Sequence, residues 1–399
     1  MDLQNLMKGF PPSPENQVTV ENWKKAPYNR WSFCHMRQLF ATAPVRNGST
    51  TAALPRGSTN LASVEFEGSD GKQARLEDAL KATSTDGFLV LHGGRIAMEW
   101  YDGFLRPDME HCVHSISKSI AGAIAGILVD RGMLDQDSPV TRYVPELESS
   151  GFGDASVRHV LDMTVSIDFH EEYTDPNGQG AMFHAAMGMP ARRDVEVIGL
   201  KRVLSTIRRG TGRHGDAFNY VTANSEVLGW ILERATGLPY SSLLEAYIWR
   251  PLGTEASASV LVDPFGSARA GGGLAMTLRD LGRFGEMIRC RGMSSGNQVV
   301  PGWWIDDIRS NGNRDAWSRG ELKEMFPEAH YRSQFYAIDS ANGTTVAGFG
   351  IHGQCVFVDA DAEMVVARLS SQPVAVDVEA EKMWQNGYAA IAKTLNRRP

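Results

Sequence analysis

Apolar residues recur at helical spacing in the segment that begins at Ser115. In SISKSIAGAIAGILVDRGML, Ile120, Ile124 and Ile127 lie three or four positions apart, and Gly132 ends the pattern. This spacing places the three side chains on one face of a helix. The sequence therefore predicts an amphipathic, largely buried helix that starts close to Ser115.

Strand-like patterns lie on both sides of this helix. Before it, GFLVLHGG and RIAMEWYDG are joined by a Gly-Gly turn, which predicts a hairpin. Near the C-terminus, QFYAID, GQCVFVD and EMVVARLSS alternate or run apolar as strands do, and VEAEKMWQNGYAAIAKTLNR is helical again. Between them, helical patterns dominate in VRHVLDM, DVEVIGLKRVLSTIRR, NSEVLGWILERATG and YSSLLEAYIW.

The order of these patterns predicts a two-lobed protein of mixed α/β (α+β) class. We expect residues 1–114 and 286–399 to form an α/β lobe, in which both ends of the chain share one antiparallel sheet covered by helices. Residues 115–285 are expected to form an inserted, all-helical lobe. Residues 1–62 are rich in Pro, Ser, Thr and Asn and predict an irregular arm that lies on the fold. A length of 399 residues fits this division.

Charge and composition exclude several kinds of partner. The net charge is -7 and no run of Lys or Arg stands out, so we expect no nucleic-acid partner. MDLQNLMKGFPPSPENQ has prolines where a signal peptide needs apolar residues, and no window of 18 apolar residues follows. We therefore expect a cytoplasmic protein with no membrane partner.

The cysteines are dispersed through the chain. They form no CxxC pair, so neither a disulfide framework nor a zinc knuckle is predicted. One of them, Cys112, lies three residues before Ser115 and could be a nucleophile, but we interpret it as a small buried thiol. The four are Cys34, Cys112, Cys290 and Cys355.

Two Ser-x-x-Lys motifs are candidates for nucleophilic chemistry. Ser69 and Lys72 lie in a polar turn, where a solvated lysine keeps a high pKa and is a poor base at neutral pH. Ser115 and Lys118 open the buried helix, one turn apart on the same face, so their side chains can meet. Context therefore favours Ser115 as the nucleophile.

The start of a helix also suits this chemistry. The N–H of Ser115 is an unpaired donor there, and the positive end of the helix dipole lowers the pKa of a nearby lysine. Burial acts in the same direction, so a neutral Lys118 could take the seryl proton. The alternative is a helix-capping serine followed by a surface lysine.

A Gly-x-Ser-x-Gly match at 292–296 competes with this motif. The nucleophile elbow of α/β-hydrolases needs a strand directly before the serine and a helix directly after it. Here the helical LRDLGRFGEMIRCRG precedes Ser294 and the Gly-containing NQVVPGW follows. We interpret the match as a surface loop.

Histidines and carboxylates cluster at two places without completing a metal site. His111 and His114 flank Cys112, and His170 precedes Glu171 and Glu172, but no HExxH or His-x-His-x-Asp pattern occurs. We expect no metal and no cofactor.

The Ser115 helix together with FNYVTANSEVLGWILERATG resembles the serine β-lactamase and penicillin-binding-protein superfamily. Tyr220, Thr222 and the pair Leu228-Gly229 match that family's layout, with Thr in place of the more usual Asn. The chain is also similar to the 6-aminohexanoate-dimer hydrolases, the nylon-oligomer hydrolases, through SISKS, YVPEL, VLDMTVSIDFHEEYTDP, FNYVTAN, GGGLAMTLRDLGRFG and GFGIHGQ. The resemblance implies a serine β-lactamase-like fold, a cleft between the lobes, and no metal or organic cofactor.

The superfamily's Lys-Thr-Gly strand motif falls at Gly348-Phe349-Gly350, where the lysine is missing. That lysine helps to hold the carboxylate of a β-lactam, so we expect penicillin hydrolysis to be minor. The resemblance implies that the N–H of Ile351 joins the N–H of Ser115 as the oxyanion hole.

The resemblance implies a hydrolase that cleaves carboxylic esters or linear amides through an acyl-enzyme on Ser115. Lys118 and Tyr220 would activate the serine, and either of them could be the general base. Tyr173 matches a substrate-side tyrosine of the nylon hydrolases, and His184 and His352 are further candidates for substrate contact. A carboxylesterase, or a non-catalytic ligand-binding sensor of the same fold, are the alternatives. The expected partner is a small-molecule ester or amide, and a homodimer is possible.

Overall fold

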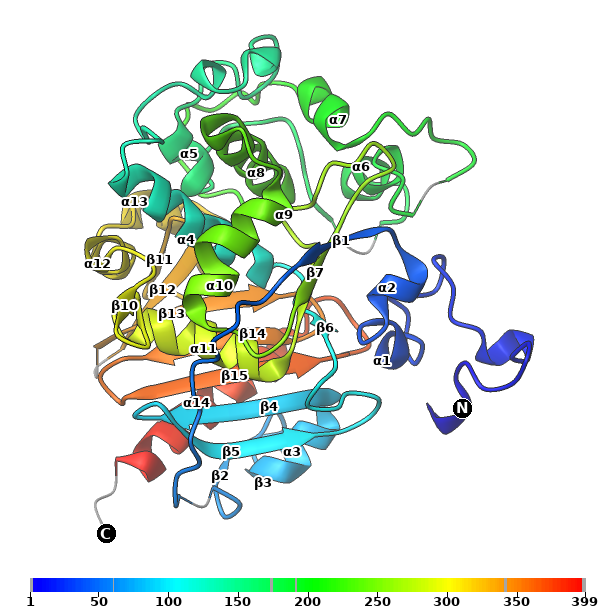
Figure 1. Ribbon diagram of the computed structural model, residues 1–399, viewed down its shortest axis with the longest axis vertical. Coiled ribbons are helices and arrows are strands. Elements are labelled where there is room, and N and C mark those ends of the chain that lie inside the picture. The colour runs from blue at the N-terminus through cyan, green and yellow to red at the C-terminus, as the bar shows by residue number, and fades with distance from the viewer. Residues whose placement is uncertain (1–2, 60, 173–174, 191, 341–342, 397–399) are drawn as a thin grey trace.

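The computed structural model describes residues 3–59, 61–172, 175–190, 192–340 and 343–396. Its centre is a seven-stranded antiparallel sheet built from both ends of the chain (Figure 1). The strands, in pairing order, are β11 (Ala329–Arg332), β12 (Phe335–Ser340), β13 (Gly343–Gly350), β14 (Gln354–Asp359), β15 (Met364–Ser370), β4 (Thr85–His92) and β5 (Arg95–Tyr101). The shared sheet and the β4–β5 hairpin confirm the prediction.

Helices cover both faces of this sheet. In β4, Leu89 and Leu91 pack in the core on the side of α11 (Leu278–Arg289), whereas Phe88 and Val90 pack on the side of α14 (Val378–Leu395). Alternate side chains of a strand point to opposite faces. Because both faces are covered, the apolar run of β4 is continuous rather than alternating.

Helix α4 (Ile116–Asp130) joins the sheet to the helical part of the molecule. It contacts β12, β13 and β14 on one side and α8 (Thr222–Thr236) on the other. A Cβ atom on Gly122 would lie 2.1 Å from the carbonyl oxygen of Ser333, and one on Gly126 would lie 2.5 Å from the indole of Trp304. The two glycines therefore let α4 pack closer to its neighbours than any side chain would allow.

Residues 115–285 are mainly helical, as expected, but not throughout. The helices of this range, besides α4, α8 and the start of α11, are α5 (Val157–Leu161), α6 (Gln179–Ala186), α7 (Leu200–Thr206), α9 (Tyr240–Leu243) and α10 (Arg250–Leu252). The prediction of a helix over 194–209 was too long, because Gly199 has φ 85° and α7 begins only after it. The carboxylate of Asp263 accepts a hydrogen bond from the N–H of Leu200 at this boundary.

A second, smaller sheet corrects the expectation of an all-helical middle segment. Its strands, in pairing order, are β1 (Thr42–Val45), β7 (Ala258–Leu261), β8 (Leu274–Met276) and β6 (His111–Cys112). Strands β7 and β8 are short, and the glycines before β8 masked their pattern in the sequence. Strand β1 also shows that the N-terminal arm is not irregular along its whole length.

The remaining elements are short or lie at the edges of the two lobes. They are α1 (Asn29–Ser32), α2 (Met36–Leu39), β2 (Glu65–Glu67), β3 (Gln73–Arg75), α3 (Leu76–Ala82), β9 (Met293–Ser294), β10 (Asn297–Gln298), α12 (Gly302–Ser310), α13 (Arg314–Ser318), the 3-10 turns η1 (Leu3–Asn5), η2 (Pro14–Asn16), η3 (Val140–Arg142) and η4 (Pro145–Leu147), and the π-helical turn η5 (Leu244–Trp249). In the described parts of the chain, no helix combines the length and the apolar character that crossing a membrane requires.

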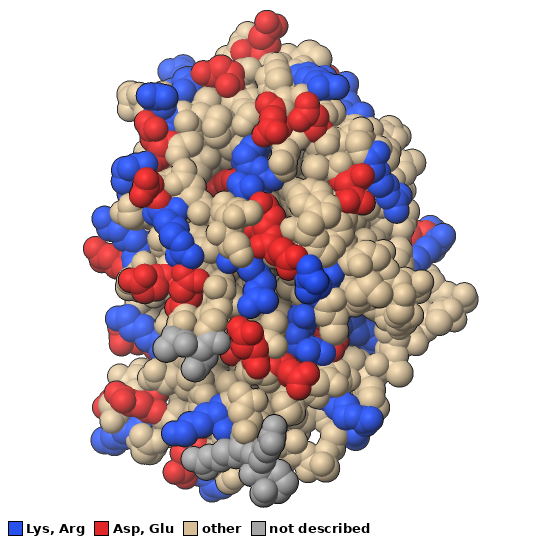
Figure 2. Space-filling view, turned by 90° about the vertical axis from the view of Figure 1, so that its left-hand side faces the viewer, with Lys and Arg blue, Asp and Glu red and all other residues tan. Residues whose placement is uncertain are grey.

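Charged side chains of both signs are interspersed on the side of the molecule where α12 and α13 lie (Figure 2). Residues of α12 and α13 form the ion pairs Arg291 with Asp306, Arg332 with Asp307 and Arg314 with Asp339. This side of the surface therefore carries no extended field of one sign.

Candidate active site

Ser115 is held at the N-terminus of α4 by a tight turn. Strand β6 pairs with β8, and the N–H of Val113 donates to the carbonyl of Leu274 over 3.0 Å. His114 then adopts a left-handed backbone conformation with φ 45°, which is uncommon for a residue other than glycine. The hydroxyl of Ser117 donates to the carbonyl of His114 over 2.6 Å and closes the turn. No glycine or turn motif before Ser115 predicted this left-handed residue.

Lys118 lies beneath Ser115, fully buried. Its Nζ atom is 2.8 Å from Ser115 Oγ and 3.2 Å from Thr222 Oγ1, and it also bonds to the carbonyl oxygen of Gly271. Burial lowers the pKa of the Lys118 ammonium to about 8, although the charge of Glu171 opposes the shift. Part of Lys118 is therefore neutral near pH 7 and able to accept the seryl proton.

The Tyr220 phenol also hydrogen-bonds with Ser115. Burial raises the pKa of its phenol above the usual value, while hydrogen bonds with Ser115 and Tyr336 counteract that rise. The Nζ atom of Lys118 lies 5.2 Å from the centre of the Tyr220 ring. Tyr220 thus keeps its proton at neutral pH, so it is suited to donate a proton and Lys118 is suited to accept one.

Glu171 holds Thr222, the first residue of α8, which in turn contacts Lys118. One carboxylate oxygen accepts from Thr222 Oγ1 over 2.7 Å, and the other accepts from the N–H of Thr222. From its sequence context Glu171 was a candidate only for metal binding, and its contact with Thr222 was not predicted. Because Glu171 lies 51 residues before Thr222 in the sequence, no local pattern indicates this contact.

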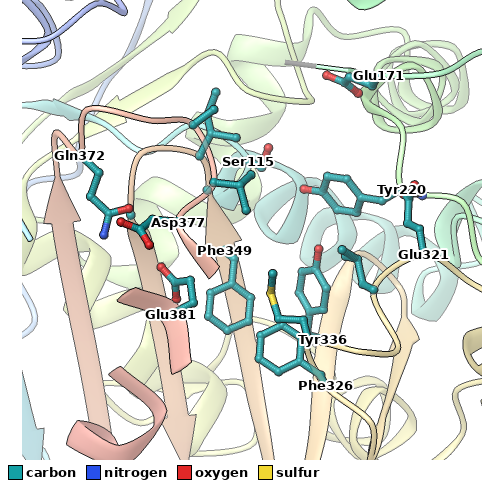
Figure 3. Close-up of a pocket in the computed structure, with 17 residues that line it drawn as sticks. Ser115, Glu171, Tyr220, Glu321, Phe326, Tyr336, Phe349, Gln372, Asp377 and Glu381 are labelled. Carbon is teal, nitrogen blue, oxygen red and sulfur yellow. Dashed lines mark hydrogen bonds between the residues drawn. The ribbon is translucent and has the colours of Figure 1, made fainter. Parts of the chain in front are cut away.

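A cavity of about 390 Å³ opens beside Ser115 and extends over the end of the large sheet (Figure 3). Ile351, which follows β13, lines it together with Ser115. A Cβ atom on Gly350 would lie 2.7 Å from the carbonyl oxygen of Val113, so the end of β13 packs against the turn that holds Ser115. This proximity is what an oxyanion hole formed by the Ser115 and Ile351 amides requires.

Gly348 has no room for the lysine that the superfamily motif would place there. Gly348 is buried, and a Cβ atom on it would lie 2.9 Å from Ser119 Oγ on α4. A longer side chain at this position would collide with the helix that carries Ser115 unless the two elements moved apart.

The cavity wall combines apolar and acidic side chains. The apolar and aromatic residues are Leu322, Met325, Phe326, Tyr336, Phe349 and Val376. The acidic residues are Glu171, Glu321, Asp377 and Glu381. Among the described residues, no Lys or Arg lines this cavity. The acidic residues come from segments far apart in the sequence, so no local pattern predicted them.

Two of the three predicted substrate-contact residues lie near the site but outside the cavity lining. His352 is buried, its Nδ1 atom is 2.7 Å from the carbonyl oxygen of Gln372, and its ring packs against Phe33. His184 on α6 is half-buried and bonds to the carbonyl of Gly180. Tyr173 lies outside the described residues. Substrate contact by these three residues stays a prediction.

The competing motifs have no such surroundings. Ser69 is exposed in the turn between β2 and β3, and Lys72 pairs with Asp70 over 3.2 Å. Ser294 lies in the β9–β10 hairpin and donates to the carbonyl of Leu252, as a loop residue does. Cys112 is buried, and burial raises the pKa of its thiol to about 11, which makes it a poor nucleophile.

His111, one of the two histidines that flank Cys112, contacts a carboxylate that pairs with the N-terminal arm. His111 Nε2 lies 3.2 Å from the buried carboxylate of Asp86, which also pairs with Arg30 over 3.1 Å. Across the described residues, no group of three or more His, Cys, Asp or Glu side chains is placed to hold a metal ion.

A serine at a helix start, bonded to a buried lysine one turn later in a cavity beside a sheet, defines a serine hydrolase of the penicillin-recognising class. The Beta-lactamase family model matches residues 74–389, and the chain belongs to this family.

Proteins of known sequence or structure place the chain more narrowly. It is 37% identical over 365 residues to the 6-aminohexanoate-dimer hydrolase of Paenarthrobacter ureafaciens, covering 91% of both chains. It is 28% identical over 167 residues to Esterase EstB of Burkholderia gladioli, covering 40% of this chain and 41% of the esterase. The fold is similar to a Bacillus anthracis protein named as a 6-aminohexanoate-dimer hydrolase, with a TM-score of 0.88, 27% identity and coverage of 97% and 99%.

Proposed function

We propose that Ser115 is the nucleophile of a hydrolase that cleaves carboxylic esters or linear amides through an acyl-enzyme. The observation that carries this proposal is the 2.8 Å contact between the buried Lys118 Nζ and Ser115 Oγ. An alcohol is too weak a nucleophile at its free pKa and needs an adjacent base. Lys118, whose pKa burial lowers to about 8, supplies that base.

The reaction begins when Ser115 Oγ attacks the substrate carbonyl and passes its proton to Lys118. Negative charge then collects on the former carbonyl oxygen, where the N–H groups of Ser115 and Ile351 stabilise it. One such donor contributes about 3 kcal/mol to lowering the barrier. Tyr220 donates a proton to the leaving alcohol or amine and regains one from the Lys118 ammonium, so both groups return to their starting state. Water then attacks the acyl-enzyme, Lys118 takes its proton and Ser115 leaves as the alcohol.

The substrate class follows from the cavity and from the relatives. One relative is named for a linear amide and another as an esterase, and both bonds yield to the same serine chemistry. The tight contact at Gly348 leaves out the lysine that would hold a β-lactam carboxylate. Linear esters and amides, including 6-aminohexanoate dimer, are therefore the proposed substrates.

Replacement of the three candidate serines tests the nucleophile. Ser115→Ala should abolish hydrolysis of nitrophenyl acyl esters and covalent labelling by a fluorophosphonate, because the buried Lys118 Nζ lies 2.8 Å from Ser115 Oγ. Ser69→Ala and Ser294→Ala are matched controls and should leave both readouts unchanged. Near wild-type turnover in Ser115→Ala would refute the mechanism, and absent labelling of the wild type would favour a ligand-binding protein.

A substrate panel tests the departure at Gly348. Short-chain nitrophenyl esters and 6-aminohexanoate dimer should be hydrolysed much faster than the β-lactam nitrocefin. The reason is that the β-lactam carboxylate finds no lysine on β13. Similar values of kcat/KM for nitrocefin and the linear esters would show that the missing lysine does not matter.

A further inference from the structure

A buried ion pair lies close to the residues that hold Lys118. Arg269 Nε donates to Glu226 Oε1 over 3.0 Å, and the N–H of Ala270 donates to the other carboxylate oxygen over 2.8 Å. Glu226 is only 2% exposed and Arg269 only 6%. Neither residue lines the cavity beside Ser115, and neither takes part in the proposed reaction steps.

The residues before β8 form a short loop that is held at three points. The N–H of Arg269 donates to the carbonyl of Leu261 in β7 over 2.9 Å, and the N–H of Leu261 donates to the carbonyl of Gly273 over 2.8 Å. These two bonds fix both ends of the loop to one strand. Glu226 fixes its middle, through the bond from Ala270. The position of the loop therefore depends on α8, which carries Glu226.

Gly271 transmits this position to Lys118, because its carbonyl oxygen accepts a hydrogen bond from Lys118 Nζ. A Cβ atom on Gly271 would lie 2.6 Å from Thr222 Cγ2 and 3.0 Å from Glu226 Oε1, so the loop packs against the first turn of α8 with no room for a side chain. Thr222 and Glu226 are four residues apart and share one face of this helix. That face contacts Lys118 directly through Thr222 and indirectly through the loop that Glu226 holds.

Stability alone does not account for an ion pair at this place. Taking two charges out of water costs about as much as their attraction returns, and apolar side chains of similar volume often stabilise a fold equally well. Charge-assisted hydrogen bonds add direction, which apolar contacts lack. The Glu226–Arg269 pair therefore fixes where the loop lies, two positions before the residue that bonds to Lys118.

Both charges of the pair also act on the Lys118 ammonium. Burial is the main cause of its low pKa, about 8. The negative charges of Glu171 and Glu226 raise this pKa, and the positive charge of Arg269 lowers it. Because the effects of Glu226 and Arg269 are opposite, the loss of either residue leaves the other charge unbalanced beside the base.

Most other ionisable groups near Lys118 keep one charge state where the lysine titrates. Burial lowers the pKa of His114 and His184 well below the usual value, so both imidazoles are neutral. Burial raises the pKa of the Tyr220 phenol, which stays protonated. Lys24 differs, because burial lowers its pKa to about 8 as well. An experiment on Lys118 therefore needs a control at Lys24.

We propose that Glu226 and Arg269 are positioning residues for the general base, because together they hold the carbonyl of Gly271 against the ammonium of Lys118. This inference deepens the proposed function and rests on it, since it concerns the base that activates Ser115. Loss of the pair should lower kcat and leave KM little changed, because neither residue lines the cavity.

The rate at which a fluorophosphonate labels Ser115, measured against pH on the full-length protein, tests the proposal. The wild-type rate should rise through about pH 8, as Lys118 becomes a free base. Glu226→Gln leaves the charge of Arg269 unbalanced and should move the midpoint to lower pH by roughly one unit, a shift that one nearby charge can cause. Arg269→Gln leaves the charge of Glu226 unbalanced and should move the midpoint upwards by a similar amount.

The double variant Glu226→Gln with Arg269→Gln separates position from charge. It removes one charge of each sign, so the midpoint should return to the wild-type pH. The labelling rate on the high-pH plateau should stay about tenfold below wild type, because the loop has lost a charge-assisted hydrogen bond. No unpaired charge is buried in this variant, so it carries the test by its plateau rate even if a single variant does not fold.

Two further variants are controls. Asp280→Asn breaks a comparably buried pair with Arg283, 2.9 Å apart on α11, and should lower the melting temperature without moving the midpoint. Lys24→Gln should keep the rise near pH 8, which assigns that rise to Lys118.

The outcomes distinguish the positioning role from the proposed function. Folded single variants whose midpoints are unmoved or move in the same direction, or a double variant with a wild-type plateau, would overturn the positioning role alone. A wild type that is not labelled, or whose labelling does not rise with pH, would contradict the proposed function and the positioning role with it.

Discussion

At the scale of single residues, the burial of Lys118 determines what Ser115 can do. The lysine is fully buried, yet its ammonium hydrogen-bonds to neutral oxygen atoms, on Ser115, Thr222 and Gly271. Neutral acceptors hold the ammonium in place without cancelling the cost of burying its charge. The pKa of Lys118 therefore falls to about 8, and the residue becomes a base at physiological pH.

Glu171 sets how far that pKa falls. Its negative charge favours the ammonium form of Lys118, so Glu171→Gln should lower the pKa of Lys118 further. Hydrolysis needs the free base, and kcat/KM should rise with pH through about 8 in the wild type. In Glu171→Gln the midpoint of this rise should move to lower pH, as pH–rate profiles with a nitrophenyl ester would show.

A surface carboxylate serves as the control for Glu171. Glu146→Gln removes an exposed charge that pairs with Arg234 and does not line the cavity, so the midpoint should stay at the wild-type pH. A midpoint that is unmoved or higher in Glu171→Gln would show that the carboxylate does not act on Lys118.

Tyr220→Phe separates proton donation from packing. The phenylalanine keeps the ring and removes the hydroxyl, so turnover of an amide should fall by roughly 10²–10⁴-fold, the usual contribution of a positioned acid. An activated nitrophenyl ester should lose less, because its leaving group departs without a proton. Tyr331→Phe, a neighbouring buried tyrosine outside the cavity lining, is the control. Equal, wild-type rates on both substrates with Tyr220→Phe would mean that Lys118 acts alone.

At the scale of secondary-structure elements, α4 transmits the packing of the sheet to Ser115. Gly122→Ala would bring a Cβ atom to 2.1 Å from the carbonyl oxygen of Ser333, and backbone cannot move aside as a flexible side chain can. The expected loss in the free energy of unfolding is about 1–3 kcal/mol, typical of overpacking, despite the better helix propensity of alanine. Urea denaturation would measure it, and kcat should fall because α4 is displaced.

Gly48→Ala is the matched substitution. There the new Cβ atom would meet its nearest neighbour at an ordinary 3.6 Å, so stability and turnover should stay close to wild type. If Gly122→Ala were as stable as Gly48→Ala, the close contact of α4 with the β11–β12 turn would not be needed.

Helices and strands with a strong local hydrophobic pattern were predictable from the sequence. Strands that exist because a distant strand pairs with them were not. The spacing of Ile120, Ile124 and Ile127 predicts α4, and the Gly-Gly turn predicts the β4–β5 hairpin; the structure shows both. Strands β7 and β8 have four and three residues, too few to show an alternation of their own. They are strands because β1 and β6 pair with them.

At the scale of the whole molecule, the cavity is a product of the fold. Ser115 and Lys118 were predictable because they lie one helical turn apart. Glu171, Glu321 and Asp377 come from three distant segments, and only the closure of the sheet against the helical lobe brings them to one cavity. A single sequence contains no spacing that joins them, so the acidic wall of the cavity could be found only in the structure.

The contact between Phe33 of the N-terminal arm and His352 after β13 should make the whole fold sensitive to acid. His352 is buried against Phe33 of the arm, and burial lowers its pKa from 6.5 to about 4, with the charge of Lys24 acting in the same direction. The unfolded chain binds this proton more readily than the folded one. The contribution of neutral His352 to the free energy of unfolding is therefore fully present above pH 6.5. It is lost as the pH drops through 4, and the loss is at most about 3 kcal/mol.

His352→Asn should make the fold less sensitive to acid over that range. Asparagine does not titrate there and tolerates the left-handed backbone at this position, where φ is 62°. Urea unfolding at pH 7, 5.5 and 4.5 should show a smaller decline in this variant than in the wild type. His170→Asn, at an exposed position, should decline as the wild type does. An undiminished decline in His352→Asn would place the acid sensitivity elsewhere, and the buried His114, whose pKa burial also lowers, would be the next histidine to replace.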